Sequence, residues 1–249
     1  MQGIDSRALA GEFVGSGLLA TVVVGSGIAA QRLSPTDTGL QLLENAVATT
    51  LGLGVLIMIF APLSGAQFNP IVSLVDAALG GRPWRDLIGY LPAQFAGCVA
   101  GVALANLMYD LPAVQSSTTE RITPGHLLSE VVATAGLVVL IFALVRTGRA
   151  RAVAPAVGAY IGAAYFFTSS SSFANPAITV ARMFTDTFAG IAPTSVPGFM
   201  VAQVIGGCLG WAVVLWLFPR SAHEDAAHPR ASAPDVTARD DVDLAPAPR

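Results

Sequence analysis

Two short stretches decide the fold: Asn69-Pro70-Ile71-Val72-Ser73-Leu74-Val75 and Asn175-Pro176-Ala177-Ile178-Thr179-Val180-Ala181. In each, an asparagine precedes a proline at the head of a short apolar run. This pattern predicts the start of a helix, because asparagine caps the first turn and proline fits its first position. Each stretch follows a small polar segment, residues 64–68 and 169–174. We call Asn69-Pro70-Ile71 the first box and Asn175-Pro176-Ala177 the second box.

The composition around the boxes is that of an integral membrane protein. Hydrophobic residues make up 53% of the chain and charged residues 12%, and the mean hydropathy is +0.64. These values exclude a typical soluble domain. A membrane-spanning helix needs about 20 mostly apolar residues. We predict six such helices, at residues 8–30, 45–61, 88–109, 127–145, 152–168 and 197–218.

The two halves of the chain repeat the same order of elements. Each half has a helix carrying a glutamate (Glu12 or Glu130), a second helix, a box, and a third helix carrying a glutamine before a glycine cluster. Because three spans is an odd number, the second copy must enter the membrane from the opposite face. The fold class is therefore an all-α integral membrane protein with six transmembrane helices and two re-entrant half-helices in an inverted repeat.

We expect one channel domain over residues 1–218, with repeat one at about 8–109 and repeat two at about 126–218. Residues 219–249 are rich in Ala, Pro, Asp and Arg and lack an apolar period, so they predict a disordered cytoplasmic tail. Non-helical backbone at membrane depth survives only inside protein or beside a watery cavity. The two boxes and the segments before them therefore predict a pore.

The arginines predict the orientation by the positive-inside rule, which places the cation-rich loops in the cytoplasm. One side of the membrane would hold Arg7, Arg82, Arg85, Arg146, Arg149, Arg151 and Arg220, and the other would hold Arg32, Arg121 and Arg182. We therefore expect a multi-pass protein of the inner (plasma) membrane with both termini in the cytoplasm.

The double Asn-Pro-Ala box, with isoleucine as the third residue of the first, resembles the aquaporin or major intrinsic protein family over about residues 8–218. The resemblance implies a homotetramer with one pore in each subunit. It also implies that Asn69 and Asn175 offer amide donors to a passing solute while two half-helix dipoles repel cations, an arrangement already described for aquaporins. Glu12 and Glu130 look like the buried glutamates that hold the re-entrant loops in this family. A proton relay is the competing role, and their matching positions favour the scaffold.

The sequence departs from this family at the outer filter. Family members usually carry arginine directly after the second box, where this chain has Ile178. An ungapped count from the boxes places Thr49, Ala163 and Ser172 at the other filter positions. This small, neutral ring predicts a wide constriction, unless Phe166, Phe167 or Phe173 narrows it. The pattern resembles glycerol-conducting members, in particular the aquaglyceroporin-like channels associated with arsenic resistance, which implies neutral arsenite or methylated arsenicals as solutes.

Arg182 follows Ile178 by four residues, which places it on the same face of a helix and one turn nearer the outside. It is either a displaced filter arginine or, four residues before Asp186, one half of a salt bridge at the mouth. We favour the paired, structural interpretation.

The leading hypothesis is a passive channel for small uncharged solutes such as glycerol-like polyols and water. The alternatives are an ion-coupled secondary transporter and a non-conducting structural membrane protein. We expect no enzyme and no catalytic residues, because no nucleophile with a base, metal-ligand cluster or phosphate loop is evident. We likewise expect no cofactor, no bound metal and no nucleic-acid partner, only small neutral solutes and the lipid bilayer.

Overall fold

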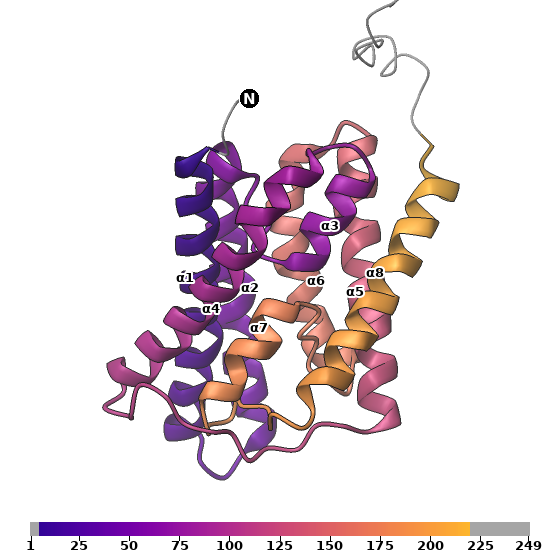
Figure 1. Cartoon of the computed structure of the whole chain (residues 1–249). Helices are drawn as coiled ribbons and strands as arrows, with labels where there is room; N and C mark the ends of the chain where they lie inside the picture. Colours follow the sequence, from indigo (N-terminus) through magenta and orange to yellow (C-terminus); the bar gives the residue numbers. More distant parts are fainter. Residues whose placement is uncertain (1–4, 220–249) are drawn as a thin grey trace, which may run out of the picture. The chain divides into compact units, whose positions relative to one another are not determined.

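The structure is a computed structural model that describes residues 5–219, and within this part of the chain it contains helices and no strands (Figure 1). Six helices are long and apolar enough to cross a membrane. They are α1 (Ser6–Leu33), α2 (Thr38–Ser64), α4 (Leu87–Met108), α5 (Pro124–Arg146), α6 (Val153–Phe167) and α8 (Val196–Leu217). The prediction of six spans is therefore confirmed. Except for its first residue, the predicted tail lies outside the described residues.

Two half-helices begin at the boxes, α3 (Pro70–Ala78) and α7 (Pro176–Ala181). Each is capped by its box asparagine: Asn69 Oδ1 accepts from the Ile71 N–H at 3.0 Å, and Asn175 Oδ1 accepts from the Ala177 N–H at 2.9 Å. Figure 1 shows α3 in the half of the bundle where α1 begins, and α7 in the opposite half. Short 3₁₀ turns complete the fold: η1 (Trp84–Asp86), η2 (Ala150–Ala152) and η3 (Arg182–Phe184).

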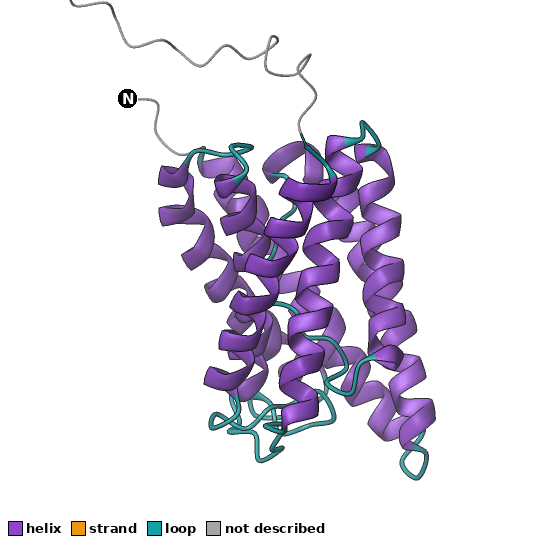
Figure 2. Ribbon diagram, turned by 90° about the vertical axis from the view of Figure 1, so that its right-hand side faces the viewer, coloured by secondary structure: helices purple, strands orange, loops and turns teal. Residues whose placement is uncertain are grey.

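The long helices pack in the same pairs in both halves of the sequence. In the first half, helix α1 contacts α4 and α2. In the second half, α5 contacts α8 and α6 in the same way. The two halves are joined by the contact between α2 and α6. Figure 2 shows the helices standing side by side, with the loops gathered at their two ends and around the half-helices. The inverted repeat expected from the sequence is therefore present in the packing.

Glycines bring the backbones of the paired helices into contact. A Cβ on Gly101 of α4 would lie 2.0 Å from the Gly17 carbonyl oxygen of α1, and one on Gly210 of α8 would lie 2.7 Å from the Ala135 oxygen of α5. Any larger residue would push the helices apart. Small residues at helix contacts are how membrane helices approach closely in lipid, where no hydrophobic effect draws them together.

The segment before each half-helix follows the same unusual backbone path. Ala66 and Phe68 in the first loop have φ of 48° and 49°, and Ser172 and Ala174 in the second have φ of 50° and 47°. Residues with a side chain rarely adopt this left-handed region, and each such residue costs about 1 kcal/mol or more. Other interactions must therefore hold the two loops in place.

Two fully buried glutamates hold these loops. The carboxylate of Glu12 accepts hydrogen bonds from Ser64 Oγ (2.6 Å), Gln67 N (3.0 Å), Phe68 N (2.8 Å) and Gln94 Nε2 (2.8 Å). The carboxylate of Glu130 accepts from Ser170 Oγ (2.6 Å), Phe173 N (2.9 Å), Ala174 N (2.8 Å) and Gln203 Nε2 (2.7 Å). The two sets match position by position, so each carboxylate ties a loop to two spanning helices.

The third residue of the first box fits a glycine on the last helix. A Cβ on Gly207 of α8 would lie 2.5 Å from Cγ2 of Ile71, which is only 3% exposed. The branched side chain has one favoured rotamer in a helix and cannot swing away easily. The isoleucine in place of alanine in the first box is therefore accommodated by the missing side chain at position 207.

We predict that Glu12→Gln destabilises the protein by about 2 to 3 kcal/mol. The amide replaces one carboxylate oxygen, which accepts hydrogen bonds, by an NH₂ group, which cannot accept them from the N–H and O–H groups of the loop. Thermal unfolding in detergent measures the change. Glu44→Gln is the matched control, since Glu44 accepts one hydrogen bond, from Ser34 Oγ, near the start of α2. Unchanged stability of the Glu12 variant would refute the scaffold role and favour a proton relay.

A second prediction concerns the Ile71–Gly207 contact. Gly207→Ala should lower the unfolding temperature because the new methyl group collides with Ile71. Adding Ile71→Ala should recover part of that loss, with a coupling of about 1 kcal/mol. Gly25→Ala controls for the helix propensity gained, because its nearest neighbouring atom would be 3.7 Å away. Simple additivity of the two single substitutions would show that they do not share a contact.

Candidate pore

One cavity of about 570 Å³ passes both boxes. One end of the cavity is lined by Asp76, Arg82 and Arg151, and the other end by Phe173 and Arg182. The lining also includes Asn69 and Asn175, the asparagines of the two boxes. We call the two ends the Asp76 end and the Arg182 end. The cavity therefore extends from the region of the first half-helix to that of the second.

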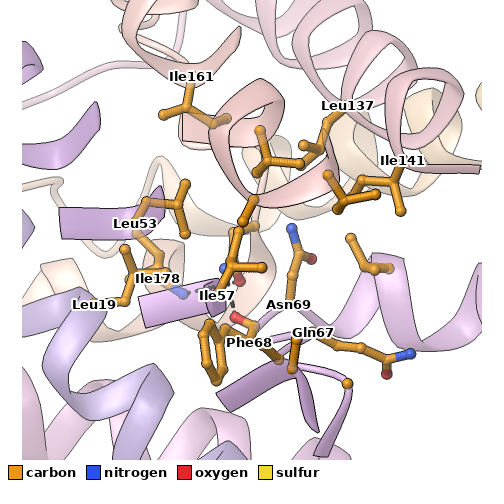
Figure 3. A pocket seen from close by; sticks show the side chains of 18 of the residues that line it. Leu19, Leu53, Ile57, Gln67, Phe68, Asn69, Leu137, Ile141, Ile161 and Ile178 are labelled. Atoms are coloured by element: carbon orange, nitrogen blue, oxygen red, sulfur yellow. Dashed lines mark hydrogen bonds between the residues drawn. The ribbon is translucent and has the colours of Figure 1, made fainter. Parts of the chain in front are cut away.

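Most of the cavity wall is apolar and comes from the spanning helices. Figure 3 shows Asn69 surrounded by branched side chains from several helices. The apolar lining includes Leu19, Leu53, Ile57, Leu137, Ile141 and Ile161. Such a wall offers no hydrogen bonds, so a solute in the cavity depends on the few polar groups that face it.

The two box asparagines are tied to each other's loops. Asn69 Nδ2 donates to the Ala174 carbonyl at 2.8 Å, and Asn175 Nδ2 donates to the Phe68 carbonyl at 2.8 Å. Each amide nitrogen carries a second hydrogen, and both asparagines line the cavity. The pair can therefore present two donors to an oxygen atom of a solute while its own position is fixed.

Three of the four residues expected in the filter line the cavity. Thr49, Ser172 and Ile178 all belong to its wall. The Thr49 hydroxyl lies 3.1 Å from the hydroxyl of Tyr165, and both side chains are buried. Ile178, the residue after the second box, is 4% exposed.

The fourth filter expectation, Ala163, is corrected by the structure. Ala163 is exposed on the outside of α6 and does not belong to the lining. The side of α6 that faces the cavity carries Val157, Ile161 and Tyr165, at spacings of four residues. An ungapped count fails here because it ignores helix phase, whereas the i, i+4 stripe was readable in the sequence and would have identified Tyr165.

The three phenylalanines that the sequence placed near the filter differ in their positions. Phe166 and Phe167 are each 55% exposed and lie outside the lining. Phe173 is buried, lines the Arg182 end, and packs edge-on against Phe199, with ring centroids 5.2 Å apart. Of these three phenylalanines, only Phe173 can therefore restrict the cavity.

The expected pair of Arg182 and Asp186 is also corrected. Helix α7 ends at Ala181 and gives way to a 3₁₀ turn and then an extended Thr185, so the four-residue helical spacing is not realised. Asp186 is exposed and accepts hydrogen bonds from the backbone and hydroxyl of Thr118. Arg182 is 4% exposed, and its Nε donates to the Ala189 carbonyl.

The loop between α4 and α5 covers this side of the bundle and brings a second arginine close to Phe173. Arg121 donates to the carbonyls of Gly190 (2.7 Å) and Phe188 (3.0 Å), and burial lowers its pKa from the usual value. Beside it, hydrogen bonds from Thr194 and Ser195 hold the pKa of Glu120 below its usual value. No signal in the sequence placed Arg121 near the pore, because its position depends on the path of a long loop.

The described residues hold no group of three or more metal-ligating side chains. Glu12 and Glu130 do not line the cavity, and their oxygens are occupied by the loops. What remains is an apolar passage with a donor pair near its middle and charged side chains at both ends. Such a passage can accept a small solute that carries its own oxygen atoms.

Comparison with known proteins agrees with this architecture. The sequence profile of the family described as major intrinsic protein matches residues 3–173, a range that stops before the second box. Aquaglyceroporin AqpS of Rhizobium meliloti is 50% identical over 87% of this chain and 93% of its own length. Aquaporin Z of Brucella melitensis is 29% identical over 84% of this chain and 95% of its own length.

Among solved structures, the aquaglyceroporin from Plasmodium falciparum superposes with a TM-score of 0.64 at 22% identity, covering 84% of this chain and 94% of that one. This likeness concerns the fold. Taken together with the family profile and the 50% identical relative, it leads to one conclusion: the chain belongs to the major intrinsic protein family, the family of the aquaporins and aquaglyceroporins.

Proposed function

We propose that this chain carries glycerol-like polyols and other small uncharged solutes passively across a membrane. Membership of the major intrinsic protein family makes it a membrane channel and not an enzyme. The observation that carries the proposal is the continuous, mainly apolar cavity that runs past both box asparagines. The relative that is 50% identical to this chain is named an aquaglyceroporin, which agrees with a polyol as solute.

The chemistry of the wall supports a solute larger than water. An apolar wall favours the carbon backbone of a polyol, while the amide donors of Asn69 and Asn175 replace hydrogen bonds that its hydroxyls lose on leaving water. Among the predicted filter residues, Thr49, Ser172 and Ile178 bring uncharged side chains to the wall of the cavity. We include Tyr165 in this filter because its hydroxyl is bonded to Thr49.

The two rival functions are less well supported. A coupled transporter needs an ion site, yet Glu12 and Glu130 are committed to the loops and lie outside the lining. A non-conducting structural protein has no use for a cavity of about 570 Å³ that passes both box asparagines.

Finer features follow from the family resemblance. We propose neutral arsenite or methylated arsenicals as further solutes, since the aliphatic Ile178 after the second box resembles channels associated with arsenic resistance. From the same resemblance we further propose a homotetramer. The distribution of arginines supports an inner-membrane protein with both termini in the cytoplasm. This orientation places the Asp76 end inside and the Arg182 end outside the cell.

Stopped-flow light scattering on proteoliposomes tests the proposal, with separate gradients of water, glycerol and a neutral metalloid acid and a pH dye inside. We expect glycerol influx well above that of empty liposomes, without an imposed ion gradient and without acidification. Influx that required an ion gradient would support a transporter, and no flux for any solute would support a structural protein.

We predict that Ile178→Arg narrows the solute range toward water. A long charged side chain at this position should lower glycerol permeability on the order of tenfold, a barrier of about 1.4 kcal/mol, while water permeability falls less. Ile178→Val is the matched control because it keeps an aliphatic wall. Unchanged glycerol permeability in the arginine variant would remove Ile178 from the filter.

A further inference from the structure

Two oppositely charged residues occupy equivalent positions in the two repeats, Asp76 in the half-helix α3 and Arg182 in the 3₁₀ turn that follows the half-helix α7. Asp76 and Arg182 each lie seven residues after their box asparagine (69 to 76 and 175 to 182), and both line the cavity. The repeat thus places an acidic side chain at one end of the passage and a positively charged side chain at the other. Their surroundings decide whether either charge is available to a solute.

The charge of Asp76 is neutralised by its neighbours. Arg82 Nε lies 3.4 Å from Asp76 Oδ2, and Gln67 Nε2 donates to the same oxygen at 2.7 Å. The Arg82 guanidinium is itself held by the Ser64 carbonyl at 3.0 Å and stacks over Tyr90. Asp76 and Arg82 therefore form a closed, paired cluster, and Arg151, the other charged residue that we placed at this end, is exposed.

Arg182 has no such partner. Within residues 5–219 it takes part in no salt bridge, and its Cζ lies 3.5 Å from the centroid of the Phe173 ring. Arg121 adds a second cation 5.5 Å from the same ring. The buried carboxylate of Glu130 accepts four hydrogen bonds and forms no salt bridge with either arginine, so one acid stands against two cations. The Arg182 end therefore keeps a net positive charge.

A buried hydroxyl without a hydrogen-bond partner belongs to a residue in the wall of the cavity, next to Phe173. Ser172 is 4% exposed and lines the cavity, yet its Oγ has no hydrogen-bond partner among the described residues. Its equivalent in the first loop is Ala66, which adopts the same backbone conformation without a hydroxyl. The fold therefore does not require the serine, and a buried hydroxyl without a partner is unfavourable unless something binds it.

We propose that Arg182 and the Ser172 hydroxyl form the specificity-determining site of the channel. The site takes small neutral solutes with neighbouring hydroxyl groups and turns small cations away before they reach the asparagines. It lies one turn beyond Ile178, the position where the family normally places its arginine. This inference rests on the proposed function, because it names the solute chemistry that the Arg182 end selects.

The test uses the full-length protein in liposomes with two probes, glycerol and methylammonium. We expect wild type to conduct glycerol and exclude methylammonium. Arg182→Gln should raise methylammonium uptake on the order of tenfold or more, because the charge that repels cations is gone. Arg182→Lys should keep the exclusion but slow glycerol, since it loses the planar set of donors. Ser172→Ala should slow glycerol and leave the exclusion intact.

Arg32→Gln is the matched control. Arg32 also stacks on an aromatic ring, that of Tyr109, and donates to a carbonyl, but it does not line the cavity. It should change neither flux. If Arg182→Gln still excludes methylammonium and conducts glycerol like wild type, the inference is overturned while the channel function stands. If wild type conducts no glycerol, the proposed function fails first, and the methylammonium result for Arg182→Gln still judges the cation barrier separately.

Discussion

The structure depends on one constraint: backbone N–H groups inside a membrane must find acceptors in the protein itself. A loop that turns back at mid-membrane cannot satisfy this rule alone. Here two carboxylates supply the acceptors, Glu12 for the first loop and Glu130 for the second. The charge needed for strong acceptance is itself expensive to bury, so each carboxylate is stable only because four donors converge on it. Loop and carboxylate each depend on the other.

The glycine contacts and the glutamines connect that constraint to the rest of the bundle. Close approach of α1 to α4 brings Gln94 within reach of Glu12, and Gln94 Nε2 also donates to Ser73 on the half-helix at 2.8 Å. In the second repeat, Gln203 joins Glu130 and Thr179 in the same way, with the latter bond also at 2.8 Å. One amide thus links a spanning helix, a loop anchor and a half-helix. The repeat preserves this linkage while the side chains that face the cavity differ between halves.

Much of the fold was predictable from the sequence, because the features that decide it are local or periodic. The boxes, the six apolar runs and the paired glutamates stand at fixed places along the chain. The residues of the pore wall were harder to predict from the sequence. Ala163 and Tyr165 are two residues apart, yet one faces outward and the other faces the cavity, and only helix phase separates them. Arg182 was expected to pair with Asp186 because a helix was assumed to continue past Ala181. Such details depend on where a helix ends, which composition does not determine.

The reciprocal bonds of the box asparagines also bear on how the protein is made. Asn69 in the first repeat donates to Ala174 in the second, and Asn175 donates back to Phe68. While the ribosome has delivered only the first three spans, the side chain of Asn69 has no acceptor and the Phe68 carbonyl has no donor. The first half is therefore an unfinished structure until about a hundred further residues have been inserted. The two reciprocal bonds can form only after the second half has been inserted, when the two half-helices meet.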